Sequence, residues 1–136
     1  MPGDVIRVLV VDDNEMLRQT LAEALDDRDI RVVGQATDGE QACWVAQEVR
    51  PDVVVMDIRM PSMSGPEATA WLTKQFPDLR VVALTAYEDA ALHQAMTRAG
   101  AVSVIVKGTS LREIVGAIRA ASVKGGATLP AQGSPQ

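Results

Sequence analysis

Five residues that could act together chemically stand directly after short apolar runs of this chain. Asp12 and Asp13 follow one run, Asp57 follows a second, Thr85 a third and Lys107 a fourth. Carboxylates held a few ångströms apart repel one another by roughly 1–4 kcal/mol for each pair, depending on the effective dielectric constant. If the three aspartates share a site, a raised pKa, the lysine or a bound cation must offset their repulsion.

Oxygen ligands of this kind are typical of a hard cation. Magnesium in proteins keeps several waters and usually takes one or two carboxylates together with a phosphate. We therefore expect Mg²⁺ beside the three aspartates. The alternative explanation is that polar residues end strands because strands reach the surface there. That explanation serves for any single residue, but a shared site accounts better for the whole set.

The elements that must position these residues are indicated by the apolar runs themselves. The runs are rich in valine and mostly do not alternate with polar residues, which is typical of parallel strands buried on both faces. They span residues 6–11, 32–36, 53–56, 81–84 and 104–106. Because the carboxyl ends of parallel strands lie at one edge of a sheet, the five residues are predicted to converge there.

Helices are predicted between and after the runs, where apolar residues recur at helical spacing. The five sets are Met16, Leu17, Leu21, Ala24 and Leu25; Ala42, Val45, Ala46 and Val49; Ala68, Trp71, Leu72 and Phe76; Leu92, Ala95, Met96 and Ala99; and Leu111, Ile114, Val115 and Ile118. Pro51, Pro77 and Gly100 stand where elements would begin or end. The alternation predicts an α/β domain with a doubly wound five-stranded parallel sheet of order 2-1-3-4-5. In this order the ligand crevice lies between strands one and three, which carry the three aspartates.

Composition limits the classes of function. The chain has 136 residues, of which 47% are hydrophobic, so one compact domain is expected rather than disorder. The formal net charge of -5 argues against direct binding of nucleic acid by this segment. A single cysteine, and no run typical of a secretory signal or a membrane span, favour a cytoplasmic protein. The domain is predicted over residues 1–124, and residues 125–136 are interpreted as a flexible tail or the start of an interdomain linker.

Four segments of the chain carry a resemblance to a known family. They read VVDDNE at 10–15, VMDIRMPSMSG at 55–65, LTA at 84–86 and VK at 106–107. Together they resemble the receiver domains of bacterial two-component response regulators, over about residues 5–123. The resemblance implies the flavodoxin-like, or CheY-like, fold of five β–α units.

The resemblance also implies a role for each residue of the expected site. Asp57 would accept a phosphoryl group from the phosphohistidine of a sensor histidine kinase. Thr85 and Lys107 would bind phosphoryl oxygens. The ligands of Mg²⁺ would be Asp13, Asp57, the backbone carbonyl of Arg59 and, directly or through water, Asp12.

Two further dipeptides, Gly100-Ala101 and Lys107-Gly108, look closest to the NarL/FixJ subfamily. That resemblance implies control of transcription through a LuxR-type helix-turn-helix domain that binds DNA and is absent from this chain. It also implies a possible homodimer through the first and fifth helices. The alternative for the fifth helix is that the sheet covers all of its apolar residues.

Other functions are compatible with the same fold. The alternative to a transcription regulator is a stand-alone receiver that acts by protein–protein contact. A phosphohydrolase of the haloacid-dehalogenase type needs a second aspartate two residues after its nucleophile, where this chain has Arg59. A flavodoxin needs hydroxyl and glycine donors after the first strand, where Asp12 and Asp13 would repel a phosphate. We therefore expect a regulatory phosphoacceptor that assists its own phosphorylation and slow dephosphorylation, and not an enzyme.

Residues around the expected site carry further predictions. Tyr87 and Arg59 flank the phosphoryl pocket in the family pattern and could tune dephosphorylation, or they could be solvent-exposed loop residues. Many receivers carry a mobile aromatic on strand five, three positions before the lysine, where this chain has Val104. Because valine is stiff at its first torsion, either Tyr87 takes over as the mobile ring or the domain signals by small backbone shifts of the strand-four loop and the fourth helix, and we expect the second.

Four residues elsewhere are given structural interpretations. Trp44 and Trp71 stand at helical spacing among apolar neighbours, which indicates packing in the core or on a helix surface. His93 has no second histidine or nearby cysteine and is predicted to be a surface residue. Cys43 is predicted to be a small buried hydrophobic residue.

Overall fold

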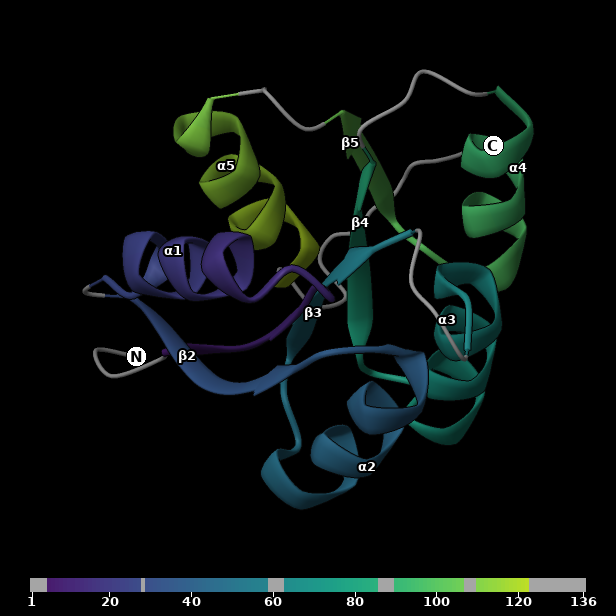
Figure 1. Cartoon of the computed structure of the whole chain (residues 1–136), viewed down its shortest axis with the longest axis horizontal. Helices are drawn as coiled ribbons and strands as arrows, with labels where there is room; N and C mark the ends of the chain where they lie inside the picture. The colour runs from purple at the N-terminus through teal and green to yellow at the C-terminus, as the bar shows by residue number, and fades with distance from the viewer. Residues whose placement is uncertain (1–4, 28, 59–62, 86–89, 107–109, 123–136) are drawn as a thin grey trace.

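A computed structural model describes residues 5–27, 29–58, 63–85, 90–106 and 110–122 of the chain. In these residues five strands alternate with five helices (Figure 1). The elements are β1 Ile6–Val11, α1 Glu15–Leu25, β2 Ile30–Ala36, α2 Gly39–Val49, β3 Val53–Asp57, α3 Gly65–Gln75, β4 Arg80–Thr85, α4 Ala90–Ala99, β5 Ser103–Val106 and α5 Leu111–Ser122. All five predicted strands and helices are therefore confirmed, whereas the predicted tail at 125–136 lies outside the described residues.

The strands form one parallel sheet in the order β2-β1-β3-β4-β5, which confirms the predicted doubly wound fold. Figure 1 shows α1 and α5 on one face of the sheet and α2, α3 and α4 on the other. One apolar cluster joins the sheet to α2, α3 and α4, and a second joins it to α1 and α5. Every residue of β3 is buried, which explains why its run is unbroken by polar residues.

Strand β2 contains one residue more than its partner β1 requires. Val8 pairs with Val32 but Leu9 pairs with Gly34, so Val33 is the extra residue of a bulge. A Cβ atom added at Gly34 would lie 2.9 Å from a methyl group of Val45 on α2. The glycine therefore lets α2 pack closely against the bulged strand.

The covered face of α1 differs from the predicted one. Leu25 is buried as expected and Leu21 is half-buried, but Met16, Leu17 and Ala24 are exposed. The stripe that faces the sheet runs instead through Leu21, Ala22 and Leu25. These residues follow helical spacing, and α1 begins beyond the last residue of β1, so the first-turn residues Met16 and Leu17 are left outside the core.

Gly100 ends α4, as its position in the sequence predicts. Its φ is +117°, and the N–H groups of Gly100 and Ala101 donate to the carbonyl of Met96. A Cβ atom at Gly100 would lie 2.8 Å from Oγ1 of Thr73, which donates to the carbonyl of Ala99 at 3.0 Å. Both the backbone conformation and the close approach of α3 therefore require glycine.

The single histidine is not the surface residue that the sequence suggested. His93 is half-buried on α4, and its Nε2 atom is inaccessible and has no hydrogen-bond partner among the residues that the structure describes. Helix α4 packs against both α3 and β5, so more of its surface is covered than a single apolar stripe indicates.

The two tryptophans lie in different surroundings. Trp44 is on the outer side of α2 with 66% of its surface exposed, so it does not belong to the core. Trp71 is half-buried against the core, and its ring meets the ring of Phe76 edge to face with centroids 6.2 Å apart. Cys43 is buried as predicted, and burial together with the charge of Glu40 raises the pKa of its thiol to about 11. In the described part of the chain, no helix has the length and apolar character needed to cross a membrane.

Candidate functional site

The three aspartates converge at the carboxyl edge of the sheet. Asp12 follows β1, Asp57 ends β3, and these strands are neighbours, with Val11 paired to Met56. The three side chains of Asp12, Asp13 and Asp57 each offer an oxygen, and these oxygens lie within 4.8 Å of one another. The predicted acidic site is therefore assembled by the strand order itself.

The three carboxylates differ in their access to water. Asp12 is 3% exposed and Asp57 is 6% exposed, whereas Asp13 is exposed. Oδ1 of Asp12 accepts a hydrogen bond of 2.9 Å from the N–H of Asn14, and Asn14 in turn caps α1 by accepting from the N–H of Leu17. The start of α1 therefore holds Asp12 in place, and Asp13 forms the side of the cluster that is open to solvent.

Arg18 is a residue near the site that sequence reasoning missed. Its Nη1 donates to the backbone carbonyl of Asp12 at 3.1 Å, and its Nε donates to Oε1 of Gln35 at 3.1 Å. The side chain thus ties α1 to the ends of β1 and β2 directly behind the acidic pair. Nothing in the spacing of the sequence distinguishes Arg18 from other helix-surface arginines, because its role depends on where β2 lies.

Thr85 lies at the end of the strand next to Asp57. Asp57 pairs with Leu84, the residue before Thr85, and the N–H of Ile58 donates to the carbonyl of Leu84 at 3.1 Å. Thr85 is 1% exposed, so its hydroxyl is held within the structure at this edge. The predicted juxtaposition of strand ends β3 and β4 is thus present.

The chain returns to the site after Asp57 at the start of α3. The N–H of Gly65 donates to the carbonyl of Ile58 at 3.0 Å, and a Cβ atom at Gly65 would lie 2.8 Å from Cα of Ile58. Ser64 caps α3 reciprocally with Glu67. Only glycine allows this approach, so Gly65 permits the close contact between the start of α3 and Ile58, directly after β3.

Several predicted site residues lie outside the described residues. They are Arg59, Ala86, Tyr87, Lys107 and Gly108. The neighbour of Lys107 in the chain, Val106, pairs with Thr85 at the end of β5. Val104, which stands where many receivers have an aromatic residue, is half-buried and packs against the apolar cluster of α2, α3 and α4. The roles of these residues remain predictions.

The chemistry of the three donor residues suits a divalent cation. All three side chains offer carboxylate oxygens, which Mg²⁺ prefers, and one of the three residues is exposed, which leaves room for the waters that Mg²⁺ retains. Three negative charges within 4.8 Å also need compensation, which a divalent cation supplies. The residues present therefore fit Mg²⁺.

Comparison with known sequences gives a consistent result. The family model described as response regulator receiver domain matches residues 8–119. Response regulator GacA of Pseudomonas viridiflava is 45% identical over 116 residues, which cover 85% of this chain and 54% of that protein. The transcriptional regulatory protein LiaR of Bacillus subtilis is 41% identical over 119 residues, which cover 87% of this chain and 56% of that protein. The chain spans about half the length of the curated relatives it matches.

Solved structures share the fold over most of the chain. The signal receiver domain of the putative response regulator NarL from Mycobacterium tuberculosis has a TM-score of 0.83 and 30% identity, and covers 88% of this chain and 98% of that chain. The response regulator domain of Thermotoga maritima CheB has a TM-score of 0.80 and 38% identity, and covers 87% of this chain and 96% of that chain.

Proposed function

Because the chain belongs to the response regulator receiver domain family, we propose that Asp57 accepts a phosphoryl group from the phosphohistidine of a sensor histidine kinase. The observation that carries this proposal is the cluster of Asp12, Asp13 and Asp57 within 4.8 Å, at the strand ends next to Thr85. In the transfer, a carboxylate oxygen of Asp57 forms a bond to phosphorus while the bond from phosphorus to the donor imidazole nitrogen breaks. The imidazole leaves with the electron pair of that bond.

The residues around Asp57 act mainly by position and charge. Mg²⁺ would be held by Asp13, Asp57 and the backbone carbonyl of Arg59, with Asp12 acting directly or through water. When bound, the ion neutralises phosphoryl oxygens, which is the main requirement of this chemistry. Thr85 would donate a hydrogen bond to one phosphoryl oxygen and Lys107 would neutralise another.

The donor protein needs a surface beside the acidic site, and α1 offers one. Met16 is 77% exposed and Leu17 is 49% exposed, and both belong to the first turn of α1, directly after the acidic pair. Apolar side chains exposed next to a reactive site favour contact with a partner protein. We assign this turn to the docking of the kinase domain that carries the phosphohistidine.

Phosphorylation would act on the rest of the domain through charge. An added charge of about -2 at a carboxylate that is only 6% exposed disturbs a closely packed edge of the sheet. The domain would then control transcription through a DNA-binding domain that is absent from this chain, as the name of the relative LiaR supports. It would act in the cytoplasm and would lose its phosphoryl group slowly, without serving as an enzyme for other substrates.

A homodimer that uses α5 would have few apolar residues of that helix available. Ile114 and Ile118 are buried against the sheet and Val115 is half-buried, which agrees with the alternative that the sheet covers them. Leu111 stays 42% exposed. A dimer that uses α5 would therefore depend on Leu111 and on the polar surface around it.

Phosphorylation with a small donor tests the proposal. Incubation with acetyl phosphate and Mg²⁺ should add one phosphoryl group, seen by intact-protein mass spectrometry, and Asp57→Asn should abolish it. Asp38→Asn is the matched control, because Asp38 follows β2 at the same edge and asparagine also caps a helix. Equal labelling of Asp57→Asn and the native protein would refute the assignment of Asp57.

A further inference from the structure

Arg18 lies one turn into α1 and reaches back to the acidic site. Side chains of a helix lean toward its N-terminus, and α1 begins two residues after Asp13. Nη1 of Arg18 donates to the backbone carbonyl of Asp12 at 3.1 Å, and Nε donates to Oε1 of Gln35 at 3.1 Å. Because Asp12 follows β1 and Gln35 belongs to β2, one half-buried side chain links α1 to both strands.

Asp13 depends on its neighbours for its position. Its carboxylate is exposed and has no hydrogen-bond partner among the residues that the structure describes. The residue before it, Asp12, is held on both sides of its backbone, since its N–H donates to the carbonyl of Ala36 at 3.1 Å and its carbonyl accepts from Arg18. A peptide group is planar and rigid, so a fixed carbonyl at Asp12 also fixes where the chain continues into Asp13. Arg18 therefore helps to set the point from which the side chain of Asp13 starts.

The charge of Arg18 and its hydrogen bonds would act on a bound cation in opposite directions. Both of its acceptors are neutral groups, so the guanidinium keeps a positive charge that repels Mg²⁺. Arg18 is half-buried, and water and salt screen part of this repulsion. A ligand residue that is already held in place loses less conformational freedom when the ion binds, which favours binding. The sign of the change in Mg²⁺ affinity therefore separates the two effects.

We propose that Arg18 is a positioning residue of the Mg²⁺ site, and that its bond to the carbonyl of Asp12 holds Asp13 in place for the ion. This inference rests on the proposed function, which makes Asp13 a ligand of Mg²⁺. Gln35 contributes through Arg18, because it accepts from Nε and so fixes the plane of the guanidinium. Arg18 supplies no ligand atom itself, since a guanidinium has only donors.

Calorimetric titration of the unphosphorylated protein with Mg²⁺ tests this role. Arg18→Met removes the guanidinium and keeps an unbranched side chain that favours a helix. Its Mg²⁺ affinity should fall by roughly tenfold, the lower end of the effect of an outer-shell change. Arg18→Lys keeps the charge but lacks the planar fork that serves two acceptors, so its affinity should also lie below that of the native protein. An affinity of Arg18→Met equal to or higher than native would show that the bonds of Arg18 do not favour Mg²⁺, and would overturn the proposal.

Gln35→Ala tests the same link without a change of charge. Its Mg²⁺ affinity should fall by less than that of Arg18→Met, because Arg18 still reaches Asp12 but is held less firmly. The double variant should bind Mg²⁺ no more weakly than Arg18→Met alone, since Gln35 acts through Arg18. Additive losses would show that the two residues act independently and would overturn the proposed link.

The Mg²⁺ dependence of phosphorylation separates positioning from a general loss of stability. With acetyl phosphate as donor, Arg18→Met should need more Mg²⁺ for half-maximal phosphorylation and should reach the native rate when Mg²⁺ saturates the site. A variant that is only less stable binds Mg²⁺ as the native protein does while it is folded. A lower limiting rate with native Mg²⁺ affinity would place Arg18 in the phosphoryl transfer and overturn the positioning role.

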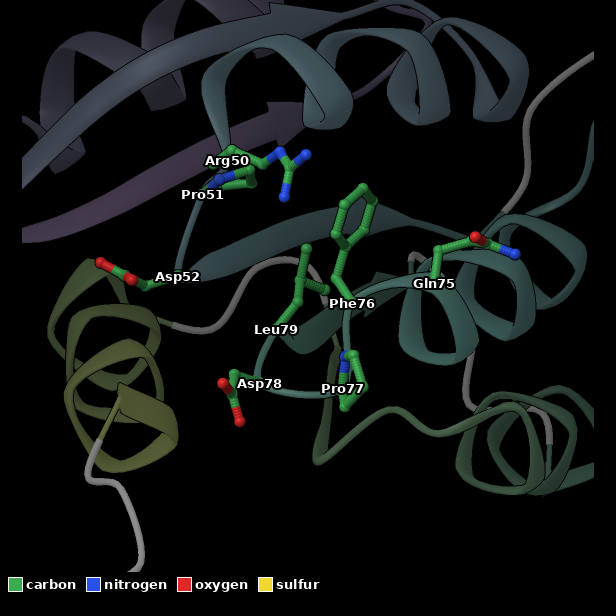
Figure 2. A pocket seen from close by; sticks show the side chains of 8 residues that line it. All are labelled: Arg50, Pro51, Asp52, Gln75, Phe76, Pro77, Asp78 and Leu79. Carbon is green, nitrogen blue, oxygen red and sulfur yellow. The ribbon is translucent and has the colours of Figure 1, made fainter.

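Arg50 offers a matched control at the other edge of the sheet. It caps α2 with φ 50°, its Nε donates to the carbonyl of Gln47 at 3.1 Å, and its guanidinium lies 5.1 Å from the centroid of the Phe76 ring. It lines a pocket of about 270 Å³ at the amino edge, opposite the acidic site, formed by residues 50–52 and 75–79 (Figure 2). Arg50 is thus a second arginine that bonds to a backbone carbonyl, but at the end of the strands away from the aspartates.

Arg50→Gly removes the same charge and keeps the left-handed cap, which glycine favours, so its Mg²⁺ affinity should equal that of the native protein. A loss as large as that of Arg18→Met would show that the effect does not depend on the carbonyl of Asp12, and would overturn the proposal. If the native protein binds no Mg²⁺, the metal site of the proposed function fails together with this inference. If the native protein and Arg18→Met bind Mg²⁺ equally well, only the role of Arg18 fails.

Discussion

At the scale of single residues, the three aspartates of the acidic site differ in exposure, and their proposed roles differ accordingly. Asp12 and Asp57 are buried, while Asp13 is exposed and forms the side of the cluster that is open to solvent. A buried carboxylate that is oriented by a backbone N–H, as Asp12 is by Asn14, is suited to hold its position during chemistry. The exposed Asp13 is suited to bind an ion that retains water.

This division predicts different effects of two substitutions on Mg²⁺ binding. Asp13→Ala removes a proposed ligand and should weaken Mg²⁺ binding by more than roughly tenfold, the lower end of the roughly 10–100-fold effect of an outer-shell change. Thr85→Ala removes a hydroxyl that is proposed to meet the phosphoryl group, so Mg²⁺ affinity should change little. Calorimetric titration of both variants measures this difference, and equal losses would mean that the two roles are reversed.

The buried thiol of Cys43 predicts a dependence of stability on alkaline pH. Its pKa is raised from 9.0 to about 11 by burial and by the charge of Glu40. The unfolded state therefore loses the thiol proton at lower pH than the folded state, and the free energy of unfolding should fall as the pH rises from 9.0 to about 11. Urea unfolding at pH values below and within this window should show a larger fall for the native protein than for Cys43→Ala. The same fall in both proteins would exclude Cys43 as its cause.

At the scale of elements, the helix ends and close approaches determine how helices sit on the sheet. Gly100 ends α4 where α3 is nearest, and Gly65 starts α3 against Ile58. Both positions place backbone where a Cβ atom would collide with a neighbouring segment. The two ends of α3 are therefore held by contacts that only glycine permits.

Gly100→Ala is predicted to destabilise the protein by at least about 1–2 kcal/mol, the cost of a left-handed conformation for alanine. Contact of the new Cβ with Thr73 adds to this cost. Gly116→Ala is the matched control, because Gly116 is exposed within α5 and no atom lies within 4 Å of the added Cβ. That variant should gain roughly 0.5–1 kcal/mol from helix propensity. Urea unfolding measures the change in the free energy of unfolding for both variants. A change in the same direction in the two variants would contradict this account.

The exposed first turn of α1 predicts a change that depends on the phosphoryl donor. Met16→Ser with Leu17→Ser should lower kcat/KM for transfer from a phosphorylated kinase domain by roughly tenfold, since apolar contact with the partner is lost. Phosphorylation by acetyl phosphate should be unchanged, because that donor needs no protein contact. Trp44→Ser, on the outer side of α2, controls for loss of an exposed apolar side chain. An equal loss with both donors would place the defect in the acidic site rather than in docking.

At the scale of the whole molecule, the two edges of the sheet have different chemistry. The carboxyl edge gathers aspartates next to Thr85, and the amino edge carries the pocket of Arg50 and Phe76. On the face of α1 and α5, Arg119 and Asp29 form a two-point ion pair with both contacts at 2.8 Å, which raises the pKa of Arg119 and ties the end of α5 to the start of β2. We therefore expect a change at the acidic site to move α5 less than elements that have no such ion pair in the described part of the chain.

Because Val104 replaces the usual aromatic residue, α4 and the loop before it are the segments expected to shift on phosphorylation. Its packed, stiff side chain cannot swing as an aromatic ring does, so phosphorylation should shift residues 90–99 without help from a ring. We expect the amide NMR spectrum of phosphorylated Tyr87→Ala to show the same shifts in 90–99 as the native protein. Loss of these shifts in the variant would make Tyr87 the switch.

The sequence by itself determined the order of the elements, the parallel sheet and the convergence of the aspartates. Apolar periodicity is local, and parallel strands place their carboxyl ends at one edge whatever the details of packing. The end of α4 at Gly100 could also be predicted from the sequence, because helix ends have local sequence signatures.

Only the tertiary structure decided which surfaces are covered. The burial of Asp12 beside an exposed Asp13, the exposure of Met16 and Leu17, and the half-buried His93 depend on contacts between distant segments. The pocket at the amino edge likewise exists because two separate loops meet before β3 and β4. Such contacts produce no periodic pattern in the sequence. Each contact depends on the distance between two elements and on the shapes of the side chains that fill the space between them.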